Sequence, residues 1–154
     1  MKPFTILASV LGLVASTSAM PLEARDDDVQ TVNLIFHGGP AQYEMSIPAD
    51  GNAYETNNTL TVSVISAPDY NAYQQCAFDF ATPEGQEAPT LASSISPEGV
   101  NQILVGPPQP VRSVRCEGMC VPTYGDCFRD GMWVGPCCAG YCAANKCRPW
   151  VPDY

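Results

Sequence analysis

Apolar and polar residues alternate through four runs in the first half of the chain. In TVNLIFH, the apolar side chains of Val32, Leu34 and Phe36 fall at every second position. The runs YEMSI, LTVSVI and CAFDF have the same period. In each run three residues are expected to share a face: Tyr43, Met45 and Ile47 in the first, Leu60, Val62 and Val64 in the second, and Cys76, Phe78 and Phe80 in the third. A period of two places alternate side chains on opposite faces of a strand. Each run therefore predicts a β-strand with one buried face.

Clusters of turn-forming residues bound these runs, as in HGGPA, PADGN, APDYN, TPEGQ, SPEG and VGPPQP. NQILV and VRSVRC are two further candidate strands, and Pro107, Pro108 and Pro110 between them predict an edge crossing before the last strand. No helical stripe of useful length is visible in the pattern. Short strands separated by such turns predict a mainly β fold, a small antiparallel β-sandwich or barrel.

Cysteine density divides the 154-residue chain into two regions. Residues 26–115 contain one of the eight cysteines, and residues 116–154 contain the other seven. The first region is long enough to form a small core from strands, whereas a region as short as the second needs covalent cross-links to hold a fold. We therefore expect a β-sandwich-like domain over residues 26–115 and a disulfide-rich module with a C-terminal tail over residues 116–154.

The N-terminal segment has the pattern of a secretory signal peptide. Lys2 precedes an apolar run from Phe4 to Ala15, and small residues at 17 and 19 mark a cleavage site, which predicts a signal peptide over residues 1–19. A buried N-terminal helix is the alternative. Residues 20–25 are expected to be a pro-segment cut after Arg25, or else part of an acidic tail that stays attached. The chain is thus expected to be secreted and extracellular, with no membrane span.

An even number of cysteines in a small secreted chain indicates a disulfide framework rather than a zinc site. Zinc would be expected with Cys and His ligands in a reducing compartment, and the one histidine, His37, lies far from the cysteine cluster. We therefore expect neither a metal nor a cofactor. Adjacent Cys137 and Cys138 are expected to bond to different partners, because neighbouring residues rarely reach disulfide geometry.

The spacing of the last seven cysteines is C-x3-C-x6-C-x9-CC-x3-C-x4-C. Without Cys116, this order, together with GPCCAGYC and NKC, resembles the inhibitor cystine knot, or knottin, family over residues 120–147. The resemblance implies pairing of the first cysteine with the fourth, the second with the fifth and the third with the sixth. The implied disulfides are Cys120–Cys138, Cys127–Cys142 and Cys137–Cys147, which leaves Cys76–Cys116 as the fourth.

The first region carries a second, weaker resemblance. FHGGPAQYEMSIPADG, LTVSVIS, QCAF and ILVGPPQP are similar to a module of small secreted cysteine-rich proteins of filamentous fungi, and LEAR resembles the pro-segments of such proteins. This resemblance implies a fungal, effector-like protein, and no activity is attached to the module.

The charge pattern excludes some partners. The formal net charge is −9, and residues 26–111 contain eleven acidic residues and no lysine or arginine. Nucleic acid and anionic membrane surfaces attract the opposite charge, so neither is an expected partner. Asn57 begins the glycosylation sequon Asn57-Asn58-Thr59 in a polar turn, and we expect it to carry a glycan.

The sequence gives little support for catalysis. His37-Gly38-Gly39 resembles an oxyanion loop of lipase-like hydrolases, but the chain lacks a G-x-S-x-G elbow and a second histidine for a triad. The carboxylates of Glu44, Glu55 and Asp79 leave glycosidase chemistry open in principle. Each has an ordinary explanation as a surface residue, so we expect a protein that is not an enzyme.

Binding residues are expected on the loops of the disulfide module, because cross-linked loops display large side chains at little cost in ordering. The candidates are aromatic, methionine and arginine residues, which are common at binding hot spots: Phe128, Arg129, Met132, Trp133, Tyr141 and Trp150. The leading hypothesis is a monomeric, effector-like protein that binds an extracellular protein of a host or competitor through these loops.

Two alternatives remain open. In the first, the module inhibits a secreted hydrolase, with Arg129 as the specificity residue for a trypsin-like target, or acts as a channel-directed toxin. The near-neutral charge of residues 116–154 disfavours the toxin. In the second alternative, Trp133, Tyr141 and Trp150 form a stacking platform for a cell-wall polysaccharide.

Overall fold

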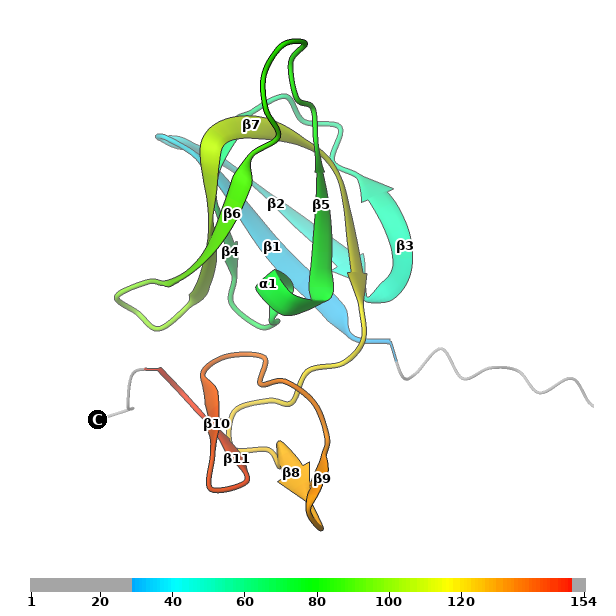
Figure 1. Ribbon diagram of the computed structural model, residues 1–154, viewed down its shortest axis with the longest axis vertical. Coiled ribbons are helices and arrows are strands. Elements are labelled where there is room, and N and C mark those ends of the chain that lie inside the picture. The colour runs from blue at the N-terminus through cyan, green and yellow to red at the C-terminus, as the bar shows by residue number, and fades with distance from the viewer. Residues whose placement is uncertain (1–28, 151–154) are drawn as a thin grey trace, which may run out of the picture.

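The computed structural model describes residues 29–150, which form a larger β body and a smaller disulfide-rich body below it (Figure 1). The larger body contains one short helix and seven strands: β1 (Thr31–Gly38), β2 (Ala41–Pro48), β3 (Asp50–Glu55), β4 (Thr61–Ala67), α1 (Ala72–Gln75), β5 (Cys76–Phe80), β6 (Thr90–Ile95) and β7 (Asn101–Glu117). The smaller body, here called the cystine module (residues 118–150), contains β8 (Phe128–Arg129), β9 (Met132–Trp133), β10 (Tyr141–Ala143) and β11 (Lys146–Arg148). The predicted mainly β fold with a disulfide-rich C-terminal part is confirmed.

Strand β1 has the buried face that its alternation predicts. Val32, Leu34 and Phe36 are almost completely buried, whereas Thr31 and Asn33 are exposed. β1 pairs along its whole length with β2, so that Phe36 lies opposite Tyr43 and their rings stack with centroids 4.5 Å apart. Burial of these apolar side chains is the main force that holds β1 against the rest of the sheet.

The predicted face of β4 is wrong beyond Ser63. Val62 is buried as expected, but Ile65 and Ala67 are buried in place of Val64. The cause is an irregularity in the pairing with β7. Val62 pairs with Gln109 and Val64 with Leu104, so four residues of β7 lie opposite the single residue Ser63. A bulge of this kind changes which side chains face the core on either side of it.

The two strands predicted from NQILV and VRSVRC are one continuous strand, β7, which is a correction to the sequence-based prediction. Residues 101–106 pair with β6, and residues 111–117 lie between β3 and β5. Pro107, Pro108 and Pro110 lie at the bend between these halves. They lack N–H groups for ladder hydrogen bonds, but they bend the strand without ending it.

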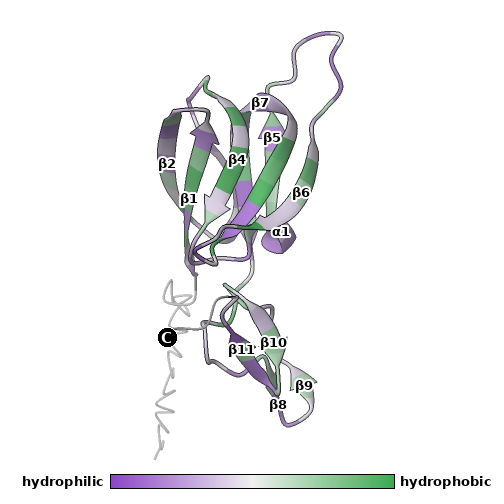
Figure 2. Cartoon of the chain, turned by 90° about the vertical axis from the view of Figure 1, so that its left-hand side faces the viewer, coloured by the Kyte–Doolittle hydropathy of each residue, from purple (hydrophilic) through white to green (hydrophobic). Residues whose placement is uncertain are grey.

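β7 thus belongs to both halves of a curled seven-stranded sheet, whose order is β2-β1-β4-β7-β3 with β5 and β6 also paired to β7. The two halves bury one core, which is built from β1, β4 and both parts of β7. Green bands on β1, β4 and β7 in Figure 2 mark these apolar residues along the strands.

β3 and β6 were not predicted from the alternation. β3 begins at Asp50 and includes the turn-like sequence Asp50-Gly51-Asn52, which the structure places in a register shift between Asp50 and Ala53. Gly51 has a φ of 81°, a conformation that glycine adopts without a steric penalty. β6 follows a long loop, and its residues are mostly exposed, so it lacks a clear apolar face.

The cystine module has a small interior made mainly of sulfur. Its buried cluster consists of Val121, Cys127, Cys137 and Cys147, with Cys142 packed against it. Three disulfides cross-link the module, Cys120–Cys138, Cys127–Cys142 and Cys137–Cys147, and a fourth, Cys76–Cys116, joins β5 to β7. The first three are the pairs that the knottin resemblance implies, and the fourth is the pair that remains. Adjacent Cys137 and Cys138 have different partners.

The expected signal peptide, the pro-segment and the last four residues lie outside the described residues. Within residues 29–150, no helix has the length and apolar character that a membrane crossing requires.

Candidate binding surfaces at the cystine module

Four of the predicted binding residues form the hairpin β8–β9. Phe128 lies opposite Trp133, and Arg129 lies opposite Met132. Asp130 and Gly131 form the two-residue turn, with φ angles of 51° and 77°. Positive φ at both central positions is typical of the tight hairpin turn that Asp-Gly favours. These four residues, which were expected on a loop of the module, therefore lie in an ordered hairpin whose pairing sets the directions of their side chains.

The pairing assigns the hairpin side chains to two faces. Residues directly opposite each other in a two-stranded ribbon share a face, so Phe128 and Trp133 lie on one side and Arg129 and Met132 on the other. The Phe128 and Trp133 rings meet edge to face, with centroids 4.9 Å apart. Trp133 is 54% exposed and Met132 is 70% exposed. Val134, which the sequence analysis did not select, follows on the Met132 side.

On the Trp133 side, a groove of about 450 Å³ lies between the cystine module and the β body. The module contributes Trp133, Tyr141 and Trp150, the three residues predicted as a stacking platform. The β body contributes Tyr73 and Gln74 of α1, together with residues from β6 and β7. We call this feature the junction groove. Aromatic residues of both bodies line it: Tyr73 from the β body, and Trp133, Tyr141 and Trp150 from the module.

Hydrogen bonds across the junction hold the walls of the groove in place. The Asn101 side chain donates to the Cys138 carbonyl at 2.7 Å, and its oxygen accepts from the Trp150 indole N–H at 3.0 Å. Trp150 in turn packs against Tyr141, with ring centroids 5.4 Å apart. The Asn71 side chain donates to the Cys137 carbonyl at 3.3 Å. Side chains of the β body thus fix the position of the module's aromatic residues.

Further contacts anchor the connection between the two bodies. The buried Tyr70 hydroxyl donates to the Gly118 carbonyl at 2.8 Å, and the Gln75 side chain donates to the Met119 carbonyl at 3.0 Å. The Gln30 side chain accepts from the Cys120 N–H at 3.0 Å. Burial, with a smaller contribution from nearby Glu117, raises the pKa of Tyr70 to about 12, so the hydroxyl stays a hydrogen-bond donor at physiological pH.

A second hollow, of about 410 Å³, lies on the Arg129 side of the hairpin. Its apolar lining includes Met119, Val121, Pro122 and Val134, and Asp126 and Arg129 line it as well. Met119 and Val134 are 61% and 50% exposed. We call this feature the apolar hollow.

Ion pairs surround Asp126 beside the apolar hollow. Its carboxylate contacts Lys146 and lies 3.6 Å from Arg129 Nη2. The hydrogen bond from Lys146 is the main cause of a lowered pKa of Asp126, and the charges of Lys146 and Arg129 add to the effect. The carboxylate is therefore ionised over the whole neutral range.

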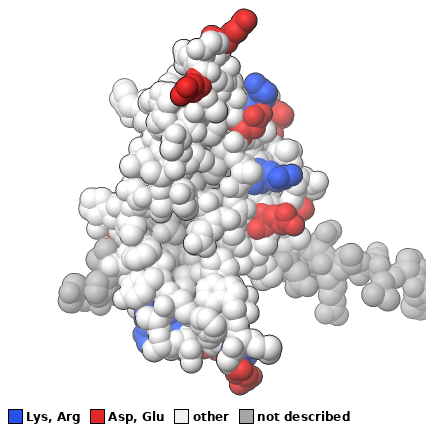
Figure 3. Space-filling model, in the orientation of Figure 1, with Lys and Arg blue, Asp and Glu red and all other residues white. Residues whose placement is uncertain are grey.

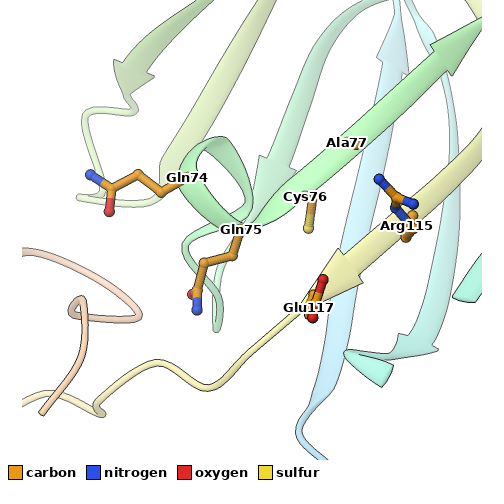
Figure 4. Close-up of a pocket in the computed structure, with 6 residues that line it drawn as sticks. All are labelled: Gln74, Gln75, Cys76, Ala77, Arg115 and Glu117. Atoms are coloured by element: carbon orange, nitrogen blue, oxygen red, sulfur yellow. The ribbon is translucent and has the colours of Figure 1, made fainter. Parts of the chain in front are cut away.

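A third hollow, of about 330 Å³, lies over the Cys76–Cys116 disulfide, where Gln75, Arg115 and Glu117 surround Cys76 (Figure 4). It contains none of the predicted binding residues, and the Gln75 side chain already bonds to the Met119 carbonyl.

The charged side chains are unevenly distributed. On the face that Figure 3 shows, they gather at the top of the β body, along one of its edges and on the flank and lower end of the cystine module. The edge includes an ion pair between Arg112 and Asp79, at 3.3 Å. The junction groove is lined by no lysine, arginine, aspartate or glutamate among the described residues.

His37 makes a contact that the sequence analysis did not predict. Its Nε2 lies 3.0 Å from the Ser66 hydroxyl on the neighbouring strand β4. Ser66 is buried, and the same hydroxyl accepts a hydrogen bond from the Gln102 amide at 3.3 Å. The His37–Ser66 pair therefore links strands within the sheet, and neither residue lines any of the three hollows.

The expectation that the protein is not an enzyme stays a prediction.

The remaining sequence-based candidates have clear positions. Asn57 is exposed in the connection between β3 and β4, and its glycosylation stays a prediction. The sulfurs of Cys127, Cys137 and Cys147 lie within 4.8 Å of one another, but each is part of a disulfide and is not the thiolate that zinc requires.

Sequence reasoning missed the contribution of the β body to the junction groove. Tyr73 and Gln74 belong to a one-turn helix, with Asn71 as its N-cap, that is too short to produce an apolar period. The one sequence feature that points to this contribution is Tyr73, a large aromatic residue in the polar run NAYQQ next to the turn APDYN.

Comparison with protein-family models, curated proteins and solved structures finds no match to this chain. The binding surfaces are therefore interpreted from their own geometry and chemistry.

Proposed function

We propose that this chain is a secreted, non-catalytic interaction protein of the effector-like, fungal kind, and that it binds an extracellular protein of a host or competitor through the cystine module. The observation that carries the proposal is an exposed apolar surface on one side of the hairpin. Met119 and Val134 line the apolar hollow there, and Met132 lies on the same side, opposite Arg129 in the pairing. Three disulfides hold the module that presents it.

The chemistry of this surface suits a protein partner. Protein interfaces have an apolar centre with a polar rim, and the Asp126–Arg129 ion pair supplies such a rim here. Methionine side chains adapt to irregular partner surfaces. A cross-linked scaffold loses little conformational entropy when it binds, which leaves more of the contact energy for affinity.

The test uses capture followed by measurement of affinity. Purified wild-type protein captures extracellular proteins of the host or competitor, and surface plasmon resonance then measures the dissociation constant of each purified candidate. Met132→Asp puts a charge on the most exposed apolar residue of this surface, and we expect affinity to fall at least about tenfold, as at a binding hot spot.

Leu104→Asp is the matched control, because Leu104 is 42% exposed and lies on β7 of the β body, outside the proposed surface. We expect this variant to bind as the wild type does. If Met132→Asp binds every captured partner with wild-type affinity, the apolar surface is not the binding site.

Inhibition of a secreted trypsin-like hydrolase is the second candidate function. It is supported by Arg129, which flanks the hairpin turn with a side chain that is 69% exposed. An inhibitor would lower the steady-state rate of trypsin-like enzymes at micromolar concentration, and Arg129→Ala would abolish the effect. Unchanged rates across a panel of secreted proteases and amylases would exclude this function.

A further inference from the structure

We propose that the junction groove binds a short, neutral oligosaccharide. This site is separate from the apolar hollow, so the inference does not depend on the proposed protein partner. The groove volume of about 450 Å³ falls within the range of small-molecule sites, roughly 300–1,000 Å³.

The charge of the groove favours a neutral ligand. The chain has 16 acidic and 7 basic residues, yet the described lining of the groove has none of either. An anionic glycan would gain no cationic partner there and would be repelled by the net charge of −9. A charged peptide would also leave without partners any ionised group that it buried in the groove, which is unfavourable.

Aromatic faces suit one side of a sugar ring. Tyr73, Trp133, Tyr141 and Trp150 all line the groove and are between 39% and 54% exposed. The face of an aromatic ring carries partial negative charge. The C–H groups on the apolar face of a pyranose carry partial positive charge, so the two surfaces attract each other and exclude water.

Polar groups at the margin suit the hydroxyl groups of a sugar. Gln74 and Ser93 are exposed and line the groove, so the amide N–H groups of Gln74 and the hydroxyl of Ser93 are accessible to a ligand. An amide and a hydroxyl each both donate and accept hydrogen bonds, as sugar hydroxyls do. The side chain of Asn101 keeps one donor and one acceptor site beyond its two bonds to the module.

The groove is organised before a ligand arrives. Trp150 is fixed by Asn101, Tyr141 packs against Trp150, and Trp133 packs against Phe128. Because the walls belong to both bodies, a bound oligosaccharide would contact the β body and the cystine module at once. A ligand that bridges two parts in this way stabilises their association by mass action.

Tryptophan fluorescence gives a direct readout. The chain has two tryptophans, and both Trp133 and Trp150 line the groove. We would titrate the full secreted protein with chitotetraose, cellotetraose, laminaritetraose and mannotetraose. We expect a saturable change in emission with at least one of them, and no saturable change with polygalacturonic acid, which is anionic.

Tyr73→Ala tests the contribution of the β body, because Tyr73 lies on α1 and is absent from any platform made by the module alone. We expect binding about tenfold weaker. Tyr124→Ala is the matched control, since Tyr124 is 54% exposed and lies outside the groove. Tyr124→Ala should bind as the wild type does.

Three outcomes would overturn the proposal. The first is the absence of a saturable change with every neutral oligosaccharide up to about 10 mM, which excludes even weak binding. The second is wild-type affinity in Tyr73→Ala. The third is saturable binding of a proline-rich decapeptide without binding of any sugar, which would assign the groove to a peptide. Met132 does not line the groove, so Met132→Asp should bind the oligosaccharide as the wild type does. A failure of the oligosaccharide proposal can therefore be distinguished from a failure of the proposed protein interaction.

Discussion

At the scale of single residues, Asp126 shows how the cystine module uses charge where it has almost no apolar core. Its carboxylate lies between Lys146 of β11 and Arg129 of β8, and it thereby connects the two hairpins of the module. Its pKa is lowered chiefly by the hydrogen bond from Lys146. The Asp126 carboxyl group therefore ionises more readily in the folded protein than in the unfolded chain.

The sign of the pH dependence follows from that shift. A carboxyl group whose pKa is lower in the folded state stabilises the fold above its unfolded pKa, and this stabilisation is lost as the pH falls through the folded pKa. We therefore expect Asp126→Asn to lower the urea midpoint of unfolding at pH 7, and we expect the difference from the wild type to shrink as the pH falls below the ordinary pKa of an aspartate. The side chain is partly exposed, so the change is small.

NMR titration of the Asp126 carboxyl carbon checks the cause. In Lys146→Met the pKa of Asp126 should rise towards the ordinary value, whereas it should stay low in Arg148→Met, a control in which a basic residue on the same strand is removed. A pKa that is equal in the wild type and in Lys146→Met would contradict this assignment.

At the scale of elements, β7 organises the β body. It pairs with β4 and β6 before its bend and with β3 and β5 after it. The Cys76–Cys116 disulfide joins two residues that are directly opposite in the β5–β7 pair, with Cα atoms 4.1 Å apart. The bond therefore fixes the register of the last strand before the chain enters the module.

Removal of this disulfide should destabilise the β body without disturbing the module. It closes a loop of 40 residues, and its loss as Cys76→Ala with Cys116→Ala should lower the free energy of unfolding by about 4 kcal/mol in the chain-entropy model. Urea unfolding followed by far-UV circular dichroism under non-reducing conditions measures the difference. A loss below about 1 kcal/mol would mean that the unfolded chain is already compact in this segment.

The sequence predicts the elements with regular alternation and misses those without it. β1 and β2 follow a period of two, and their buried faces are as predicted. β3 was missed because Asp50-Gly51-Asn52 has turn chemistry, which the structure uses in a register shift instead. The buried face of β4 changes at Ser63, because only the long-range pairing with β7 produces the bulge there.

For the candidate sites too, the sequence does not show contacts between residues that are far apart along the chain. Sequence reasoning selected the aromatic residues of the module, because residue type alone identifies them. It did not reveal that Tyr141 and Trp150 face Tyr73 across a groove, since that depends on how Asn101 and Asn71 hold the module against the β body.

At the scale of the whole molecule, the two bodies associate through side-chain hydrogen bonds and through Cys120 and Cys138 of the module, which pack in the core cluster of the β body. The Asn101 amide donates to the Cys138 carbonyl, and its oxygen accepts from the Trp150 indole N–H. Hydrogen bonds of this kind each contribute about 1 kcal/mol to stability. A few polar residues therefore add direction to the buried contacts that hold the module against the β body.

Asn101→Ala should loosen the junction. In a Trp133→Phe background, Trp150 is the single remaining tryptophan, and its emission should shift to longer wavelength as the indole loses its partner and gains water. The associated loss of junction stability should be about 1–2 kcal/mol. Asn52→Ala, an exposed asparagine on β3, is the control and should leave the emission unchanged, and an equal spectrum in both variants would argue against the role of Asn101.

The distribution of the four disulfides has a consequence for proteolysis. One closes a loop within the β body and three lie within the cystine module, so no disulfide joins the two bodies. Their covalent connection is the single exposed segment at Gly118 and Met119. One cut there would leave two internally closed fragments, and their association would become a reversible, concentration-dependent equilibrium. An extracellular protease could thus release the module from the β body while leaving all four disulfides intact.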